Sequence, residues 1–262
     1  MGQAKKNKMM FLAQHPKCCF CGGQIQSTTV DHIPARVCFP GRAYPDGFEF
    51  PACHRCQNAS RHDELIFGFY VRMMDRNAQN YDAEGTHRMI SGMANNAPHL
   101  LPNPYLSNRA KRTSLRGLGL TKPSSVLAQD IPLVEFDGKV HEHLRRYLRK
   151  IACAIFYREF NAAPGANYQV WTHWDQSTLP RAFETLQPFV EMTPYVTIGA
   201  RPNLDFGDRF SYRFNKTQEP DCLAAIAKFG EGMIAAMLIL APKMFEGIDS
   251  KESWVTVENM FG

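Results

Sequence analysis

The sequence predicts an α+β fold in which a small N-terminal module is followed by a helix and a mainly antiparallel β region. Three observations predict it: paired cysteines on either side of short β-prone runs, a glycine-poor segment with helical spacing, and a C-terminal half of strand-like runs separated by turn residues. We expect three parts, which are a module over residues 1–80, a helical, Pro/Gly-rich and basic connection over 81–125, and an α+β domain over 126–262.

The module should begin with a short basic helix that ends at Pro16, because proline disfavours helix in the residue before it. Residues 27–33 and 48–50 are the expected strands, joined by a long loop. A long helix is expected over 53–76, where the apolar residues recur at helical spacing: Leu65, Ile66, Phe69, Tyr70 and Met73.

The C-terminal domain should open with an amphipathic helix over 140–160, with Leu144, Leu148, Ile151, Ile155 and Phe156 inward and Arg145, Arg146, Arg149 and Lys150 outward. The rest is mostly strand, with expected strands over 168–172, 195–198, 210–214, 223–229 and 233–240. The last two are joined at Gly230-Glu231-Gly232, and their alanine content leaves a helix open as the alternative.

Composition limits the kinds of binding partner and the cellular compartment that we expect. A formal net charge of +5 favours anionic partners without identifying one. The longest apolar run, 233–241, is about half of a membrane span, and no secretory leader is visible, so we expect a cytoplasmic protein that does not enter membranes. In such a reducing compartment we prefer to interpret the eight cysteines as metal ligands or buried apolar groups, and not as disulfides.

Two Cys-x-x-Cys pairs, Cys18 with Cys21 and Cys53 with Cys56, have the spacing of a tetrahedral zinc site. Four thiolates leave no open position, so this zinc would be structural and the chemistry must lie elsewhere. The remaining cysteines lack partners at ligand spacing and are expected to be bystanders: Cys19, Cys38, Cys153 and Cys222. The alternative is a set of unrelated buried thiols.

A second group of donors lies next to these pairs. Asp31 and His32 end a β-prone run, and Asn58 and His62 are four residues apart on one face of the expected helix. Oxygen donors with one imidazole suit Mg²⁺ or Mn²⁺, which would leave His32 free as a base. The alternatives are a solvated pair, a helix cap and a surface histidine. Adjacent residues of a strand also point to opposite faces, which argues against a shared role.

The order Cys-x-x-Cys, Asp-His-x-Pro, and Phe-Glu-Phe-Pro-Ala-Cys-x-x-Cys-Gln-Asn over residues 16–64 resembles the HNH endonucleases of the ββα-metal class. The resemblance implies a zinc-stapled ββα-metal (HNH) module in which Asp31 and Asn58 bind the catalytic metal, with His62 as third ligand. It also implies that His32 is the general base. The asparagine that usually orients this base is replaced by Phe48-Glu49-Phe50, so Glu49 or a backbone carbonyl would orient His32. Asp63 is a competing metal ligand.

The function implied is a metal-dependent endonuclease that uses Mg²⁺ or Mn²⁺ on nucleic acid, with double-stranded DNA the expected substrate and bacterial defence a fitting role. Phosphate contacts are expected from Arg36, Arg42, Arg55 and Arg61. The rival interpretation is a catalytically inactive, zinc-stabilised module that binds nucleic acid or protein. A ligand-sensing or oligomerising C-terminal domain, and hence a homo-oligomer, is compatible with either. The sequence does not distinguish DNA from RNA as the substrate.

Overall fold

The computed structural model describes residues 2–75, 82–118, 120, 127, 133–177, 179–201, 206, 209–248 and 254–261. Both boundaries expected between the three parts, 80/81 and 125/126, lie outside these residues. None of the described helices is both long enough and apolar enough to cross a bilayer.

The N-terminal elements are a helix, a hairpin of two strands and a second, longer helix. Helix α1 (Gln3–Gln14) ends just before His15-Pro16, as expected. Strands β1 (Thr29–His32) and β2 (Glu49–Ala52) pair antiparallel, with His32 opposite Glu49. The loop between them contains two 3₁₀ turns, η1 (Arg36–Cys38) and η2 (Pro40–Arg42). Helix α2 (His54–Met74) follows, with Cys53 as its N-cap, so the two expected strands and the long helix are confirmed.

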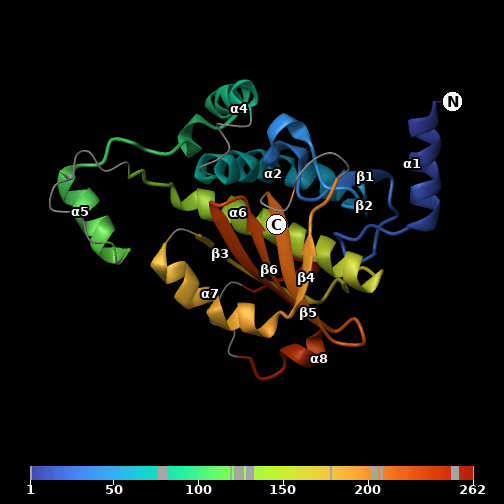
Figure 1. Ribbon diagram of the computed structural model, residues 1–262. Coiled ribbons are helices and arrows are strands. Elements are labelled where there is room, and N and C mark those ends of the chain that lie inside the picture. The colour runs from blue at the N-terminus through green and yellow to red at the C-terminus, as the bar shows by residue number, and fades with distance from the viewer. Residues whose placement is uncertain are drawn as a thin grey trace.

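The C-terminal elements form a sheet covered on both faces. Among the described residues, six strands form an antiparallel sheet in the order β4-β5-β6-β7-β3-β8. Helix α6 (Gly138–Phe160) crosses one face and helix α7 (Pro180–Met192) covers the other (Figure 1). The strands are β3 (Gln169–Gln176), β4 (Tyr195–Ile198), β5 (Phe210–Lys216), β6 (Cys222–Phe229), β7 (Met233–Leu240) and β8 (Val255–Thr256).

The two central strands explain why the last apolar pair is not helical. β6 and β7 are buried along most of their length because helices cover both faces of the sheet, which favours a continuous apolar run over alternation. Their connection turns tightly at Gly230, whose φ of 56° is in the left-handed region that favours glycine. The alternative of two helices is therefore excluded.

The module rests on α6 through a shared hydrophobic core. The ring of Phe67 on α2 lies 4.8 Å from Tyr147 of α6 and 5.2 Å from Phe229 of β6, centroid to centroid. The backbone N–H of Ala35 donates to the Tyr147 hydroxyl at 2.7 Å. Helix α6 thus has α2 on one side and the sheet on the other, as Figure 1 shows.

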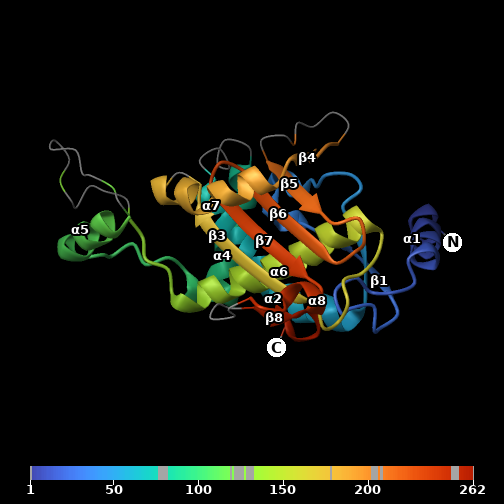
Figure 2. The same ribbon diagram turned by 90° about the horizontal axis from the view of Figure 1, so that it is seen from below.

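The bounds of several elements were not predicted from the sequence. Helix α5 (Asn108–Gly117) lies within the connection that was expected to be helical, and it projects from the body of the molecule (Figure 2). Helix α7 interrupts the region expected to be mostly strand, and it begins at Pro180, where a proline suits the first helical turn. The other elements are α4 (Ala83–Asn96), η3 (Pro98–Leu100), α8 (Pro242–Phe245) and η5 (Val257–Asn259).

Candidate functional site

Four buried cysteines gather at the base of the hairpin. The Sγ atoms of Cys18, Cys21, Cys53 and Cys56 all lie within 4.8 Å of one another. In each pair a backbone N–H points at the first sulfur: that of Phe20 lies 3.4 Å from Cys18 Sγ, and that of Cys56 lies 3.4 Å from Cys53 Sγ. N–H groups aimed at sulfur stabilise thiolates, so these four side chains fit a metal such as zinc, and the expected ligand set is brought together.

The turn after the first pair needs glycine. Gly22 has a φ of 68°, and a Cβ atom there would lie 2.4 Å from the backbone of Ala166. The knuckle therefore packs directly against the segment that links α6 to β3. The other four cysteines lie outside the cluster, and burial raises the pKa of the Cys38 and Cys153 thiols, as expected of apolar bystanders.

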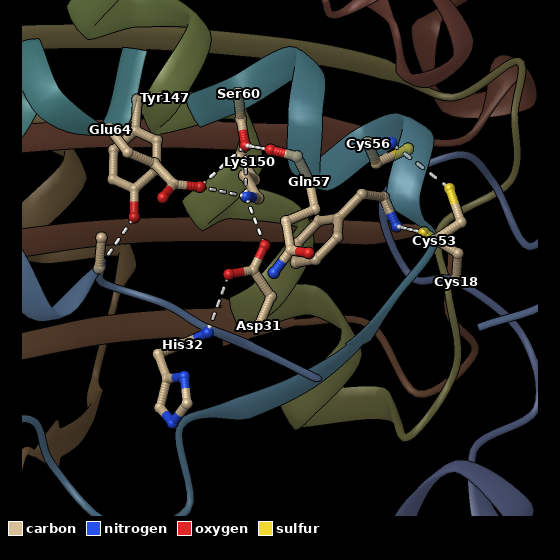
Figure 3. Close-up of polar contacts among 12 residues, drawn as sticks. Cys18, Asp31, His32, Cys53, Cys56, Gln57, Ser60, Glu64, Tyr147 and Lys150 are labelled. Atoms are coloured by element: carbon tan, nitrogen blue, oxygen red, sulfur yellow. Dashed lines mark hydrogen bonds and ion pairs between the residues drawn. The ribbon is translucent and has the colours of Figure 1, made fainter. Parts of the chain in front are cut away.

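Asp31 and His32 point to opposite faces of β1. The Asp31 carboxylate is buried and turns toward α6, whereas the half-buried imidazole of His32 points away from it (Figure 3). The two residues are still linked, because the backbone N–H of His32 donates to Asp31 Oδ1 at 3.0 Å. The sequence argument against a direct shared role for the two side chains agrees with this geometry.

Lys150 of α6 fills the space in front of Asp31. Its Nζ lies 2.6 Å from Asp31 Oδ2, 2.5 Å from Ser60 Oγ and 2.7 Å from Glu64 Oε1, as Figure 3 shows. The lysine side chain is 0% exposed. The prediction that Lys150 points outward was wrong, since the side of α6 that carries it packs against α2 instead of facing solvent. The arginines expected outward with it are half-buried: Arg145, Arg146 and Arg149.

The charges in this buried group are strongly coupled. Burial alone would lower the pKa of Lys150, but the carboxylates of Asp31 and Glu64 outweigh it and the pKa is raised. Burial, together with the charge of Asp31, raises the pKa of Glu64. The ammonium is therefore retained at neutral pH.

Helix α2 presents Ser60 and Glu64, and not the pair named from the sequence, to the Lys150 ammonium that contacts Asp31. Asn58 and His62 are each two residues earlier, a rotation of about 200° around the helix, and both are exposed. The ring of His62 lies 5.2 Å from that of His143, centroid to centroid. The structure thus brings neither Asn58 nor His62 to Asp31.

Asp63 is also engaged elsewhere. Its Oδ1 lies 2.6 Å from His143 Nδ1 and 3.1 Å from a guanidinium nitrogen of Arg146. A metal site needs several donor side chains close together. Among the described residues, one group of three or more Cys, His, Asp or Glu side chains meets this condition, and it is the group of four cysteines. The residues expected to hold a catalytic Mg²⁺ or Mn²⁺ therefore do not fit one as they are arranged.

His32 lies in a cluster of cations and one aromatic ring. Its Nε2 lies 2.9 Å from a guanidinium nitrogen of Arg36, and its ring meets that of Tyr44 edge-on at 4.3 Å. Arg36 stacks on Tyr44 at 4.5 Å, and Arg201 lies over the same ring at 5.3 Å. Burial and the charge of Arg36 lower the pKa of His32.

Of the other residues named from the sequence, Glu49 is the one placed beside His32. It lies directly opposite on β2, where side chains of paired residues share a face, and its charge raises the pKa of His32 against the two lowering effects. The remaining expected phosphate contacts are exposed: Arg42, Arg55 and Arg61.

Arg201 was missed by sequence reasoning. It lies just after β4, far from the module in sequence, and only the packing of the sheet beside the long β1–β2 loop brings it to Tyr44. No local pattern marks it. Lys150 was missed for a similar reason, because the periodicity of α6 does not reveal that a second helix covers its polar side.

No family model, curated protein or solved structure matches this chain. The function is therefore inferred from the chemistry of the residues described above.

Proposed function

We propose that this protein binds nucleic acid over the β1–β2 hairpin and hydrolyses its phosphodiester bonds, with His32 as the general base. The observation that carries the proposal is the cluster of a half-buried imidazole and two guanidinium groups around the Tyr44 ring. In this hydrolysis His32 would take a proton from water as the water attacks phosphorus, and the phosphorus–oxygen bond to the leaving nucleoside would break. The guanidinium groups would hold the phosphate and balance the charge on the leaving oxygen, which takes its proton from solvent.

The protonation of His32 suits a base. A guanidinium group only donates hydrogen bonds, so Nε2 of His32 must be the acceptor toward Arg36, and this assignment puts the ring proton of the neutral form on Nδ1. The lowered pKa keeps the imidazole neutral at pH 7. When a phosphate draws Arg36 away, Nε2 is free to accept a proton from the attacking water.

The same cations would hold the substrate. Arg36 and Arg201 carry two positive charges around one ring, and Arg42 is exposed in the same loop. Guanidinium groups bind phosphate oxygens through paired N–H donors and do not read base sequence. With a net charge of +5, the chain suits a polyanion, and we propose double-stranded DNA as the substrate.

The proposal includes one metal ion, a structural zinc. The four cysteines would hold a zinc ion that fixes the hairpin to α2, and such a closed site supplies folding energy without an open position for substrate. The oxygen donors expected for Mg²⁺ or Mn²⁺ are not gathered around a common point, so no step of the mechanism is assigned to a divalent ion there.

A second candidate is a zinc-stabilised module that binds nucleic acid and does not cut it. The observation that favours it is the contact of 2.6 Å between Lys150 Nζ and Asp31 Oδ2, which occupies the carboxylate that the resemblance assigns to the metal. This candidate shares the cationic cluster, and it differs only in the absence of hydrolysis.

The test is a cleavage assay on purified, zinc-loaded protein with supercoiled plasmid, linear DNA and RNA, each with Mg²⁺, with Mn²⁺ and with neither. The proposal expects cleavage by the native protein and by a His87→Ala control, since His87 is exposed on α4. His32→Ala should cleave about 10²-fold to 10⁴-fold more slowly. Binding without cleavage under every condition would leave the binding module as the function.

A further inference from the structure

The polar pocket behind His32 already contains a cation, which the chain supplies itself. Lys150 Nζ has three oxygen neighbours at 2.5–2.7 Å, from Ser60, Asp31 and Glu64. An ammonium group has three N–H donors, so each proton has an acceptor. The rings of Phe20 and Tyr147 close the pocket, with Nζ 5.1 Å and 5.9 Å from their centroids.

The Lys150 ammonium balances the negative charge of the carboxylates around it. Asp31 and Glu64 together carry two negative charges, and removal of Lys150 would leave them facing each other with one hydroxyl group beside them. Two carboxylates and a hydroxyl are oxygen donors of the kind that Mg²⁺ and Mn²⁺ bind. Lysine at this position therefore takes the place that a divalent ion would otherwise fill.

We propose that Lys150 is the resident cation of the pocket formed by Asp31, Ser60 and Glu64, so that no divalent ion binds at Asp31 in the native protein. The carboxylate that the resemblance assigns to a metal is neutralised by an internal ammonium, and the module departs from the ββα-metal pattern at this point.

Both oxygens of Asp31 have partners in this arrangement. One contacts Lys150, and the other accepts a hydrogen bond from the backbone N–H of His32. The salt bridge therefore ties the end of β1 to α6.

The experiment measures Mn²⁺ binding by electron paramagnetic resonance on full-length, zinc-loaded protein in chelator-treated buffer. Four proteins are compared with the native one: Lys150→Ala, Asp31→Asn, the double variant, and Lys139→Ala, which removes an exposed lysine from the same helix. Native protein and Lys139→Ala should show no Mn²⁺ binding that depends on Asp31. Lys150→Ala should gain one site per chain, and the double variant should lose it.

Two results would overturn the inference. One is native protein that binds Mn²⁺ and loses it on Asp31→Asn, and the other is a folded Lys150→Ala protein that gains no site. If Lys150→Ala does not fold, the comparison of native protein with Asp31→Asn decides alone. The Mn²⁺ measurement does not depend on cleavage. A native protein that cuts no nucleic acid would therefore contradict the proposed function, while the role of Lys150 as resident cation would still be decided by Mn²⁺ binding.

Discussion

A guanidinium nitrogen of Arg36 lies 2.9 Å from Nε2 of His32, so the residue we propose as the base and the cation we propose to bind phosphate share one hydrogen bond. Burial and this positive charge both favour the neutral imidazole and lower its pKa. Substrate phosphate would neutralise Arg36, and the basicity of His32 would rise as the substrate binds.

The first prediction concerns the titration of His32. Its pKa, read from the imidazole shifts in an NMR titration, should lie below the ordinary 6.5. Arg36→Ala should raise it, because a positive charge that disfavours the imidazolium is gone. Arg55→Ala, at an exposed position on α2, is the control and should leave the value unchanged. An Arg36→Ala protein in which His32 titrates at the same or a lower pH would contradict the arrangement described.

The second prediction concerns the cysteine cluster. Native protein should contain about one equivalent of zinc, the content of a closed four-thiolate site, and Cys53→Ser should lose the metal and melt at a lower temperature. Cys222→Ser removes a cysteine outside the cluster and should keep the zinc. Elemental analysis together with thermal melting checks both, and full zinc in Cys53→Ser would show that the four thiols do not act as one site.

The third prediction concerns the stability of the Lys150 pocket. Lys150→Ala leaves two carboxylates, on side chains 8% and 20% exposed, without their buried cation. It should lower the free energy of unfolding by about 3–5 kcal/mol, as breaking a buried ion pair does. Lys139→Ala should change it by less than about 0.5 kcal/mol. Urea denaturation measures both, and equal stabilities would mean that the buried salt bridge does not form.

Much of the fold could be predicted from local sequence, because the signals were local. Cys-x-x-Cys spacing, the helical periodicity after Cys53, and the apolar runs of β6 and β7 each lie within one element. Helix α7 was missed because it contains Pro188, and proline disfavours the interior of a helix, so the segment lacks a clear helical signal.

The site was less predictable, because it depends on which side of a helix meets its neighbour. Asn58 and His62 share a face of α2, as their spacing requires, but that face is exposed. Ser60 and Glu64 instead contact Lys150, the residue that pairs with Asp31. Spacing fixes which residues lie together on a helix and leaves the direction of that face open. Arg201 could not be found at all, since it reaches Tyr44 only through the tertiary packing of the sheet.

The fourth prediction concerns Arg201. If it contacts a phosphate, Arg201→Ala should weaken binding of all DNA sequences alike and reduce the slope of log affinity against log salt by about 1. Arg88→Ala, at an exposed ion pair on α4, should leave the slope unchanged. Fluorescence anisotropy with labelled duplexes at several salt concentrations gives both slopes. An unchanged slope for Arg201→Ala would place the nucleic acid away from Tyr44.

The most direct test of the central claim is the single-turnover cleavage rate of His32→Ala under conditions in which the native protein cuts DNA. A positioned base contributes about 10²-fold to 10⁴-fold to such a rate, so His32→Ala should be slower by that factor while its affinity for the duplex and its zinc content stay at the native values. His87→Ala should cut at the native rate. A His32→Ala protein that binds duplex and cuts it as fast as the native protein would contradict the assignment of His32 as the base.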